Sequence, residues 1–115
     1  MNYKRGDVIL VRFPNSNLTT YKKRPALIVQ NDGLNTSLPQ TIVAMITTNL
    51  SRTGPTRVSI KKSDPIGQKM GLLSDSVVVT DNLATVSDRE IDRAIGNCQA
   101  MQQINQALKN TLGIP

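Results

Sequence analysis

The first eighty residues consist of short apolar runs separated by turn residues, and this spacing most constrains the fold. Gly6 and Pro14 bound "GDVILVRFP", whereas "PALIVQN" and "QTIVAMITT" are followed by Asp, Asn, Ser or Gly. Runs of this length with such boundaries predict β-strands, and the second and third runs are apolar enough to be buried on both faces. Several short strands at close spacing predict a small β-barrel.

The remaining segments before residue 98 are less uniform. "TRVSIKK" alternates like a half-exposed strand, and "GLLSDSVVVTD" predicts one or two strands with a polar break. The polar tract "NSNLTTYKK" has no period and predicts a loop. "SDREIDRAIGN" is ambiguous, because Ser87 and Glu90 fit a helix capping box whereas Gly96 would interrupt a long helix.

The end of the chain has a helical pattern. Apolar residues recur there at steps of three and four, at Met101, Ile104, Leu108 and Leu112. This stripe predicts an amphipathic helix that Gly113 and Pro115 terminate, and we expect it to pack on the barrel. No repeat or second domain is visible, so we expect one mainly β domain, residues 1–115, with a C-terminal helix.

Composition narrows the function classes. There is no histidine, and the single cysteine, Cys98, has no histidine to activate it, so we expect it to be a small core residue. The same absence argues against most zinc sites, and we expect neither a metal nor a cofactor. No run is long enough to cross a bilayer and no signal peptide is evident, which together favour a cytoplasmic protein without a membrane partner.

Charge is unevenly distributed along the chain, which carries a net +6. Residues 1–62 hold ten Lys or Arg against two acids, whereas residues 63–115 hold four against six. The basic half could meet a phosphate backbone. A bias toward solubility would explain the charge equally well.

The strongest candidate chemistry comes from an arginine and a threonine. Arg24 precedes Pro25, which holds it extended, and we expect it at the edge of a rigid strand. Thr47 and Thr48 end the next strand, so Arg and Thr could meet at one rim of a shared sheet. A guanidinium and a hydroxyl could stabilise a phosphorane-like transition state without a metal. Taken singly, each is equally well an ordinary surface or strand residue.

The order of these pieces resembles the MazF/PemK family of toxin endoribonucleases. "RGDVILVRFP", a polar loop, "RPALIVQND" and "TIVAMITTNL" follow one another as in that family, and "GLLSDSVVVTDNLATVSD" and the C-terminal helix extend the resemblance over nearly the whole chain. The Arg-Pro strand is its most specific piece.

The resemblance implies a small SH3-like β-barrel with a C-terminal helix, in a homodimer. It implies cleavage of single-stranded RNA, usually mRNA, at a short sequence and without a metal. The substrate's 2′-hydroxyl would be the nucleophile, and the products would carry a 2′,3′-cyclic phosphate and a 5′-hydroxyl. A cognate antitoxin with an acidic flexible segment would neutralise the activity.

By position, Arg24 matches the family's catalytic arginine and Thr47 its catalytic threonine. We expect substrate contacts from residues near them in the motifs: Tyr21, Lys22, Lys23, Asn31, Thr48, Asn49, Asp81 and Asn82. Val79 and Ala84 stand where relatives place arginines. A second cation, if one is needed, would come from Lys22, Lys23 or the other subunit.

Two other functions remain open at this point. A toxin of the same fold could bind a topoisomerase and leave Arg24 and Thr47 idle, but the paired Arg-Pro and Thr-terminated strands favour a nuclease. A barrel could also bind RNA without cleaving it. The scarcity of aromatics counts against that reading, because only Tyr21 and Phe13 could stack on bases.

Overall fold

The computed structural model describes residues 3–14 and 20–115, and for Phe13, Pro14 and Tyr21 it describes the backbone alone. Most of the "NSNLTTYKK" tract, and the side chains of Phe13 and Tyr21, the two aromatics considered for base stacking, therefore lie outside the described part of the chain.

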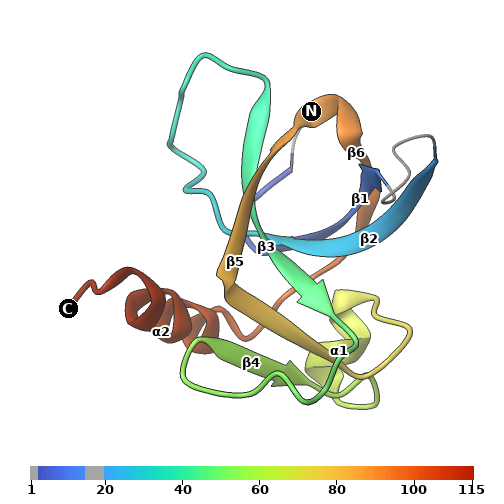
Figure 1. The fold of residues 1–115 in the computed structure, drawn as a ribbon, viewed down its shortest axis with the longest axis vertical. Coiled ribbons are helices and arrows are strands. Elements are labelled where there is room, and N and C mark those ends of the chain that lie inside the picture. The colour runs from blue at the N-terminus through green and yellow to red at the C-terminus, as the bar shows by residue number, and fades with distance from the viewer. Residues whose placement is uncertain (1–2, 15–19) are drawn as a thin grey trace.

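The described residues form one strongly curved antiparallel sheet with short helices against it (Figure 1). The strands are β1 (Asp7–Pro14), β2 (Tyr21–Ile28), β3 (Gln40–Thr47), β4 (Arg57–Ile60), β5 (Ser76–Ser87) and β6 (Ile91–Asn97). The helices are α1 (Pro65–Met70), the 3₁₀ turn η1 (Asp88–Glu90) and α2 (Met101–Leu112). The strand order is β4-β5-β3-β2-β1-β6, and no described ladder joins the two edge strands. The predicted mainly β, barrel-like fold with a C-terminal helix is confirmed.

The second strand differs most from its predicted position. We expected it at residues 25–31 after a loop, but β2 begins at Tyr21 and ends at Ile28. Residues 21–23 are polar, and they are extended because β1 pairs with them, from Pro14↔Tyr21 to Arg12↔Lys23. A polar segment of this kind lacks the alternating apolar residues by which a strand is recognised in a sequence. Its strand conformation is therefore evident only from its pairing with β1.

The ambiguous segment at residues 87–97 is a strand preceded by a single turn. Ser87 stands before η1 but makes no side-chain capping bond, and β6 follows at once. Gly96 lies in β6 against the end of α1, where an added Cβ would collide with the backbone of Lys69 and Met70. Its role is close packing of a helix on a strand and not the interruption of a helix. Helix α1 itself was not anticipated.

Strand β5 is continuous, but it bends sharply about halfway (Figure 1). Its pairing with β3 jumps from Ala44↔Leu83 to Met45↔Val79, so residues 80–82 have no partner on β3. The buried Thr80 holds this bend: its hydroxyl donates to the carbonyl of Thr56 at 2.6 Å and lies 2.8 Å from the Thr111 hydroxyl. These contacts tie β5 to the start of β4 and to α2.

The two faces of the sheet bury different cores. One face packs against the helices and β4, and its core includes Val8, Leu27, Ala44, Val78 and Ile104. The other face lines the inside of the curve with Ile9, Val11, Ala26, Ile28, Val43, Val86 and Ile91. Successive strand residues thus alternate between the two cores, as a pleated sheet requires.

Helix α2 packs on the first of these cores, as predicted from its stripe. Ile104 is fully buried, Leu108 is partly buried and Leu112 is exposed, so the packing weakens toward the helix end. Cys98 is buried in the same core, which confirms its expected role. Burial raises the pKa of its thiol. Among the described helices, none is long and apolar enough to span a membrane.

Candidate functional site

Strands β2 and β3 diverge at the place where the predicted catalytic pair lies. Their ladder covers only three pairs, from Ile28↔Val43 to Ala26↔Met45. Beyond this point β2 pairs only with β1, and β3 only with β5. Continued by two residues, the register would set Arg24 opposite Thr47 on one face of the sheet. The two residues therefore lie on the same face of the sheet, in strand segments that no longer pair with each other.

Arg24 lies inside β2 and not at its edge, which corrects the sequence-based expectation. Its Cα is paired with that of Val11, because the β1–β2 ladder continues past it to Tyr21. The side chain is exposed and has no hydrogen bond or ion pair with the described residues. Its whole fork of donors is therefore available to an anion.

Thr47 is the last residue of β3 and is half-buried. Its hydroxyl oxygen accepts a hydrogen bond from the backbone N–H of Asn49 at 3.1 Å. The Asn49 side chain in turn accepts from the backbone N–H of Ser51 at 3.2 Å and from its hydroxyl at 2.6 Å. This series of short turns fixes where the Thr47 oxygen points and leaves its hydrogen free to donate.

The neighbouring lysines of β2 project to opposite faces. Lys22 is two residues from Arg24 and shares its face, whereas Lys23 lies between them and faces the other way. Lys22 is exposed and has no partner among the described side chains. Lys23 instead lines a cavity on the far side of the strand, together with Thr48. Lys22 is therefore the better placed candidate for a second cation.

Lys23 is held by a carboxylate that sequence reasoning did not find. Asp92 in β6 accepts from Lys23 Nζ at 3.2 Å and from Arg93 Nη1 at 3.1 Å, and it lies 3.6 Å from Arg12 Nη2. The hydrogen bond from Lys23 is the largest cause that lowers the pKa of Asp92, and the charges of Lys23, Arg93 and Arg12 lower it further. Three cations share one carboxylate, so this cluster keeps a net positive charge.

Asp81 and Asn82 lie away from Arg24, at the bend of β5. Asp81 forms a bidentate pair with Arg57 of β4, at 3.1 Å and 2.9 Å. This hydrogen-bonded arginine is the largest cause that lowers the pKa of Asp81. Strands β5 and β3 separate β4 from β2, so within this chain the pair is not assembled with the predicted catalytic residues.

Of the other residues expected to contact the substrate, some lie beside Thr47 and others do not. Thr48 and Asn49 follow Thr47 directly and belong to its neighbourhood. Asn31 follows the opposite end of β2, where its side chain accepts from the N–H of Gly33 at 3.0 Å, and it is not brought near Arg24. Tyr21 pairs with Pro14 through the backbone, and its side chain lies outside the described part.

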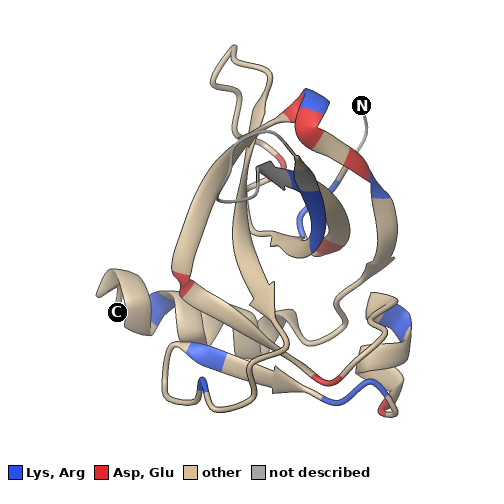
Figure 2. Ribbon diagram, turned by 45° about the vertical axis from the view of Figure 1, so that its right-hand side comes forward, with Lys and Arg blue, Asp and Glu red and all other residues tan. Residues whose placement is uncertain are grey.

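Charge is distributed over several elements (Figure 2). Acidic residues gather around the turn between β5 and β6, and two of the later acids, Asp81 and Asp92, neutralise cations from the basic half of the chain. Within residues 3–14 and 20–115, no three His, Cys, Asp or Glu side chains meet in a way that could hold a metal ion.

Comparison with known proteins gives one consistent result. The curated endoribonuclease MazF of Staphylococcus saprophyticus is 31% identical, and the match covers 96% of this chain and 92% of that protein. A mycobacterial endoribonuclease solved in complex with its cognate antitoxin superposes with a TM-score of 0.74 at 30% identity, covering 99% of this chain and 98% of that one. The Mycobacterium tuberculosis toxin MazF-mt6 gives a TM-score of 0.72 at 26% identity, covering 95% and 98%.

A family model describes the same relationship over almost the full length. The model of the PemK-like, MazF-like toxins of type II toxin–antitoxin systems matches residues 4–112, a span that contains every described strand and both α-helices. This match and the 31% identity to the Staphylococcus saprophyticus protein show that the chain belongs to the PemK-like, MazF-like toxin family.

Proposed function

We propose that the chain is an endoribonuclease toxin that cleaves single-stranded RNA by attack of the substrate's own 2′-hydroxyl. The observation that carries this proposal is that Arg24 and Thr47 lie on one face of the sheet, two residues beyond the last pair that joins β2 and β3. The names of the Staphylococcus and mycobacterial relatives support the reaction class.

The unpaired guanidinium of Arg24 would bind the non-bridging oxygens of the scissile phosphate. Its two-pronged fork matches a phosphate, and its positive charge offsets the extra negative charge of the pentacoordinate transition state. Thr47 would donate its hydroxyl hydrogen to the same group, because its oxygen is already oriented by the Asn49 N–H. Lys22, on the same face, would contact a neighbouring phosphate.

The proposed step is a transesterification, in which atoms and protons balance. The 2′-oxygen forms a bond to phosphorus and loses its proton, while the bond from phosphorus to the 5′-oxygen breaks and that oxygen gains a proton. The products are a 2′,3′-cyclic phosphate and a 5′-hydroxyl. The nucleophile belongs to the RNA, so the chain needs no activated serine or cysteine.

The decisive experiment uses two substrates that differ at one atom. A single-stranded RNA should be cut in the presence of EDTA, and the same strand with a 2′-deoxy nucleotide only at the cut position should stay intact. Cleavage of the deoxy-substituted strand would falsify the mechanism. Binding of the all-RNA strand without any fragments would identify a non-catalytic RNA-binding barrel instead.

We further propose that the toxin acts in the cytoplasm as a homodimer, and that a cognate antitoxin with an acidic flexible segment neutralises it. The mycobacterial structure that superposes on this chain was solved with its cognate antitoxin, which supports such a partner. The net charge of +6 would attract an acidic chain over a distance and speed its association. Light scattering at micromolar concentration should give twice the mass of one chain, and the mass of a single chain would contradict the dimer.

A further inference from the structure

Thr47 is followed by two hydrogen-bonded turns that share one residue, Asn49. In the first turn, the Asn49 backbone N–H donates to the Thr47 hydroxyl oxygen at 3.1 Å. In the second, the Asn49 side-chain oxygen accepts from the backbone N–H of Ser51 at 3.2 Å and from the Ser51 hydroxyl at 2.6 Å. Side-chain bonds to a backbone group two residues farther on form tight turns and compete with strand pairing. They explain why β3 ends at Thr47.

These turns form the near end of the loop that joins β3 to β4, and other contacts hold its far end. Arg57 Nη1 donates to the Thr53 carbonyl at 3.2 Å, and the Asn110 side chain of α2 donates to the Pro55 carbonyl at 2.8 Å. The far end is thus tied to β4 and to a helix. The near end, beside Thr47, is held by the bonds of Asn49.

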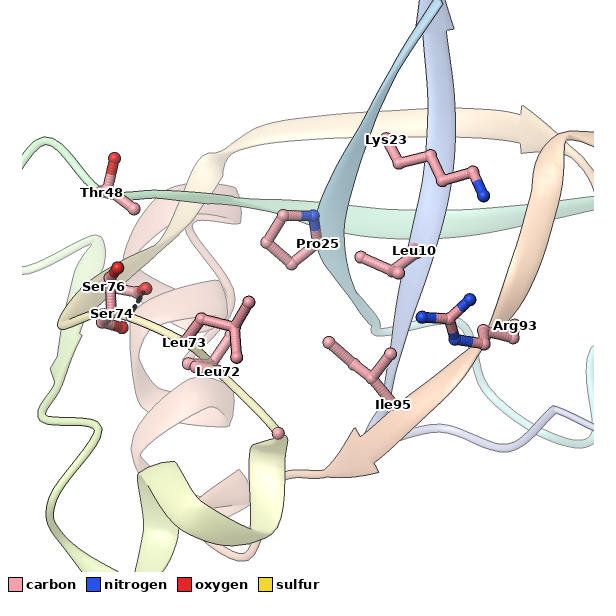
Figure 3. A pocket seen from close by; sticks show the side chains of 11 residues that line it. Leu10, Lys23, Pro25, Thr48, Leu72, Leu73, Ser74, Ser76, Arg93 and Ile95 are labelled. Carbon is pink, nitrogen blue, oxygen red and sulfur yellow. Dashed lines mark hydrogen bonds between the residues drawn. The ribbon is translucent and has the colours of Figure 1, made fainter.

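Thr48 lies between the two residues of the first turn and faces the other side of the sheet. It lines the cavity of about 340 Å³ shown in Figure 3, at the point where β3 passes into the loop. Because neighbouring strand residues alternate, the Thr47 side chain is directed to the face of Arg24. A hydroxyl that accepts a hydrogen bond has fewer directions left for its own hydrogen and donates it more strongly. The Asn49 N–H therefore both orients and strengthens the donor that Thr47 would offer to a phosphate.

The Asn49 N–H can act in this way only while the turn keeps its shape. Thr48, Asn49, Leu50 and Ser51 are all exposed, so packing against the core does not hold them in place. The two bonds from Ser51 to the Asn49 side-chain oxygen supply that restraint. A catalytic donor must be held within about 0.5 Å of its productive position. Loss of the Asn49 oxygen would let the turn open and the Thr47 hydroxyl leave that position.

We propose that Asn49 is a positioning residue for RNA cleavage, whose side chain closes the turn that presents its own N–H to Thr47. The inference rests on the proposed function, in which Thr47 donates to the scissile phosphate. It replaces the direct substrate contact expected of Asn49 with a role that passes through Thr47. The Asn49 side-chain nitrogen has no hydrogen bond with the described residues, so a direct contact with RNA is the competing role that the experiment must separate.

The first test compares the cleavage rate at saturating RNA with the affinity for RNA. Affinity is measured by fluorescence anisotropy on a strand that carries a 2′-deoxy nucleotide at the cut position. Asn49→Ala should lower the single-turnover rate by about threefold to tenfold, as expected for loss of one hydrogen bond, and should leave the affinity within about a factor of two. A loss of affinity with an unchanged rate would make Asn49 an RNA contact and overturn the proposal.

A double-mutant cycle with Thr47 separates the two roles. If Asn49 acts only through the Thr47 hydroxyl, Thr47→Ala should cleave at the same rate with and without Asn49→Ala. An equal loss in both backgrounds would reveal an independent contact and overturn the proposal. Asn49→Asp keeps the oxygen that accepts from Ser51, so it should cleave faster than Asn49→Ala in raised salt, which screens its charge. The opposite order would count against the proposal.

A measurement that needs no cleavage follows the hydrogen bond itself. Ser51→Ala removes the hydroxyl that donates to Asn49 but leaves residues 48 and 49 unchanged, and with them the intrinsic exchange rate of the Asn49 amide. In ¹⁵N-labelled protein, this amide should exchange with solvent at least about twofold faster in Ser51→Ala, because the turn opens more often. Equal exchange rates would show that the side chain does not hold the turn, and the proposal would fail.

Asn35 provides a matched control beyond the opposite end of β3. It is also an exposed asparagine, and its side-chain oxygen accepts from the N–H of a serine two residues on, Ser37, at 2.9 Å. Asn35→Ala should cleave and bind RNA as the unchanged protein does, and an equal loss of rate there would overturn the proposal. If the unchanged protein cleaves RNA and Asn49→Ala does so at the full rate, only this inference fails. Absence of cleavage by the unchanged protein refutes the proposed function.

Discussion

Removal of the Arg24 guanidinium should abolish most RNA cleavage and leave the fold intact. The side chain is exposed and has no partner among the described residues, so Arg24→Ala leaves no polar group unsatisfied. A surface change of this kind should alter the free energy of unfolding by no more than about 0.5 kcal/mol. Loss of one donor to a transition-state oxyanion costs about 3 kcal/mol, which corresponds to roughly two decades in rate.

Single-turnover cleavage of a long RNA, followed as loss of full-length strand, measures the rate. Thermal unfolding of the same preparation measures the fold. Arg24→Lys separates charge from geometry, since lysine keeps the positive charge but loses the planar fork that binds two phosphate oxygens. We therefore expect Arg24→Lys to cleave much more slowly than the unchanged protein and to melt at the same temperature.

Arg89→Ala is the matched control, because Arg89 is also an exposed arginine but lies in η1 and pairs only with Glu90. It should cleave at the unchanged rate. If Arg24→Ala cleaves within about a factor of two of the unchanged protein, a difference below roughly 0.5 kcal/mol in the barrier, the role assigned to Arg24 is wrong. An equal loss in both variants would show that bulk charge, and not the position of Arg24, determines the rate.

Three further predictions follow from contacts described above. Thr47→Ala should lower the cleavage rate by about tenfold to a hundredfold, whereas Thr47→Ser, which keeps the hydroxyl, should retain most activity in the same assay. Gly96→Ala should lower the free energy of unfolding by at least about 1 kcal/mol and so lower the denaturant midpoint, because the new Cβ collides with the backbone of α1; an unchanged midpoint would contradict that packing. The lowered pKa of Asp92 means that its ion pairs contribute stability above the ordinary aspartate pKa of about 3.9 and lose it as pH falls through the lowered value. The stability difference between the unchanged protein and Asp92→Asn should therefore be constant near neutral pH and shrink in acid, and a difference that grew on acidification would contradict the assignment.

Patterns along the chain were sufficient for the central strands and the last helix. β3 lies where the apolar run "QTIVAMITT" predicts it, and α2 spans the whole stripe from Met101 to Leu112. In both segments the side chains that face the core are themselves apolar, so burial is visible in the sequence. The segment around Arg24 was also recognised, although its position within β2 was not.

The remaining features depend on pairing between distant segments. Arg12 and Asp92 meet because β1 lies between β2 and β6, and no local pattern shows that order. The extended backbone of Tyr21 and Lys22 is imposed by β1, and Gly96 is required by the close approach of α1. Such constraints come from segments that are distant in the sequence. Their only trace in the local sequence is a single polar residue or glycine, which is too little to predict the contact.

The position of β1 in the sheet has a consequence for the protein during its synthesis. β1 pairs with β2 next to it in the chain, but its other edge pairs with β6, from Asp7↔Asn97 to Val11↔Ile91. Contacts of such high sequence separation form late, because the intervening chain must be ordered first. On the ribosome, β1 through β5 emerge while one edge of β1 is still open, and the Asp92 cluster cannot assemble. A nascent chain therefore completes this sheet only after β6 has been translated, so the fold of the nuclease is not complete on the ribosome before that point.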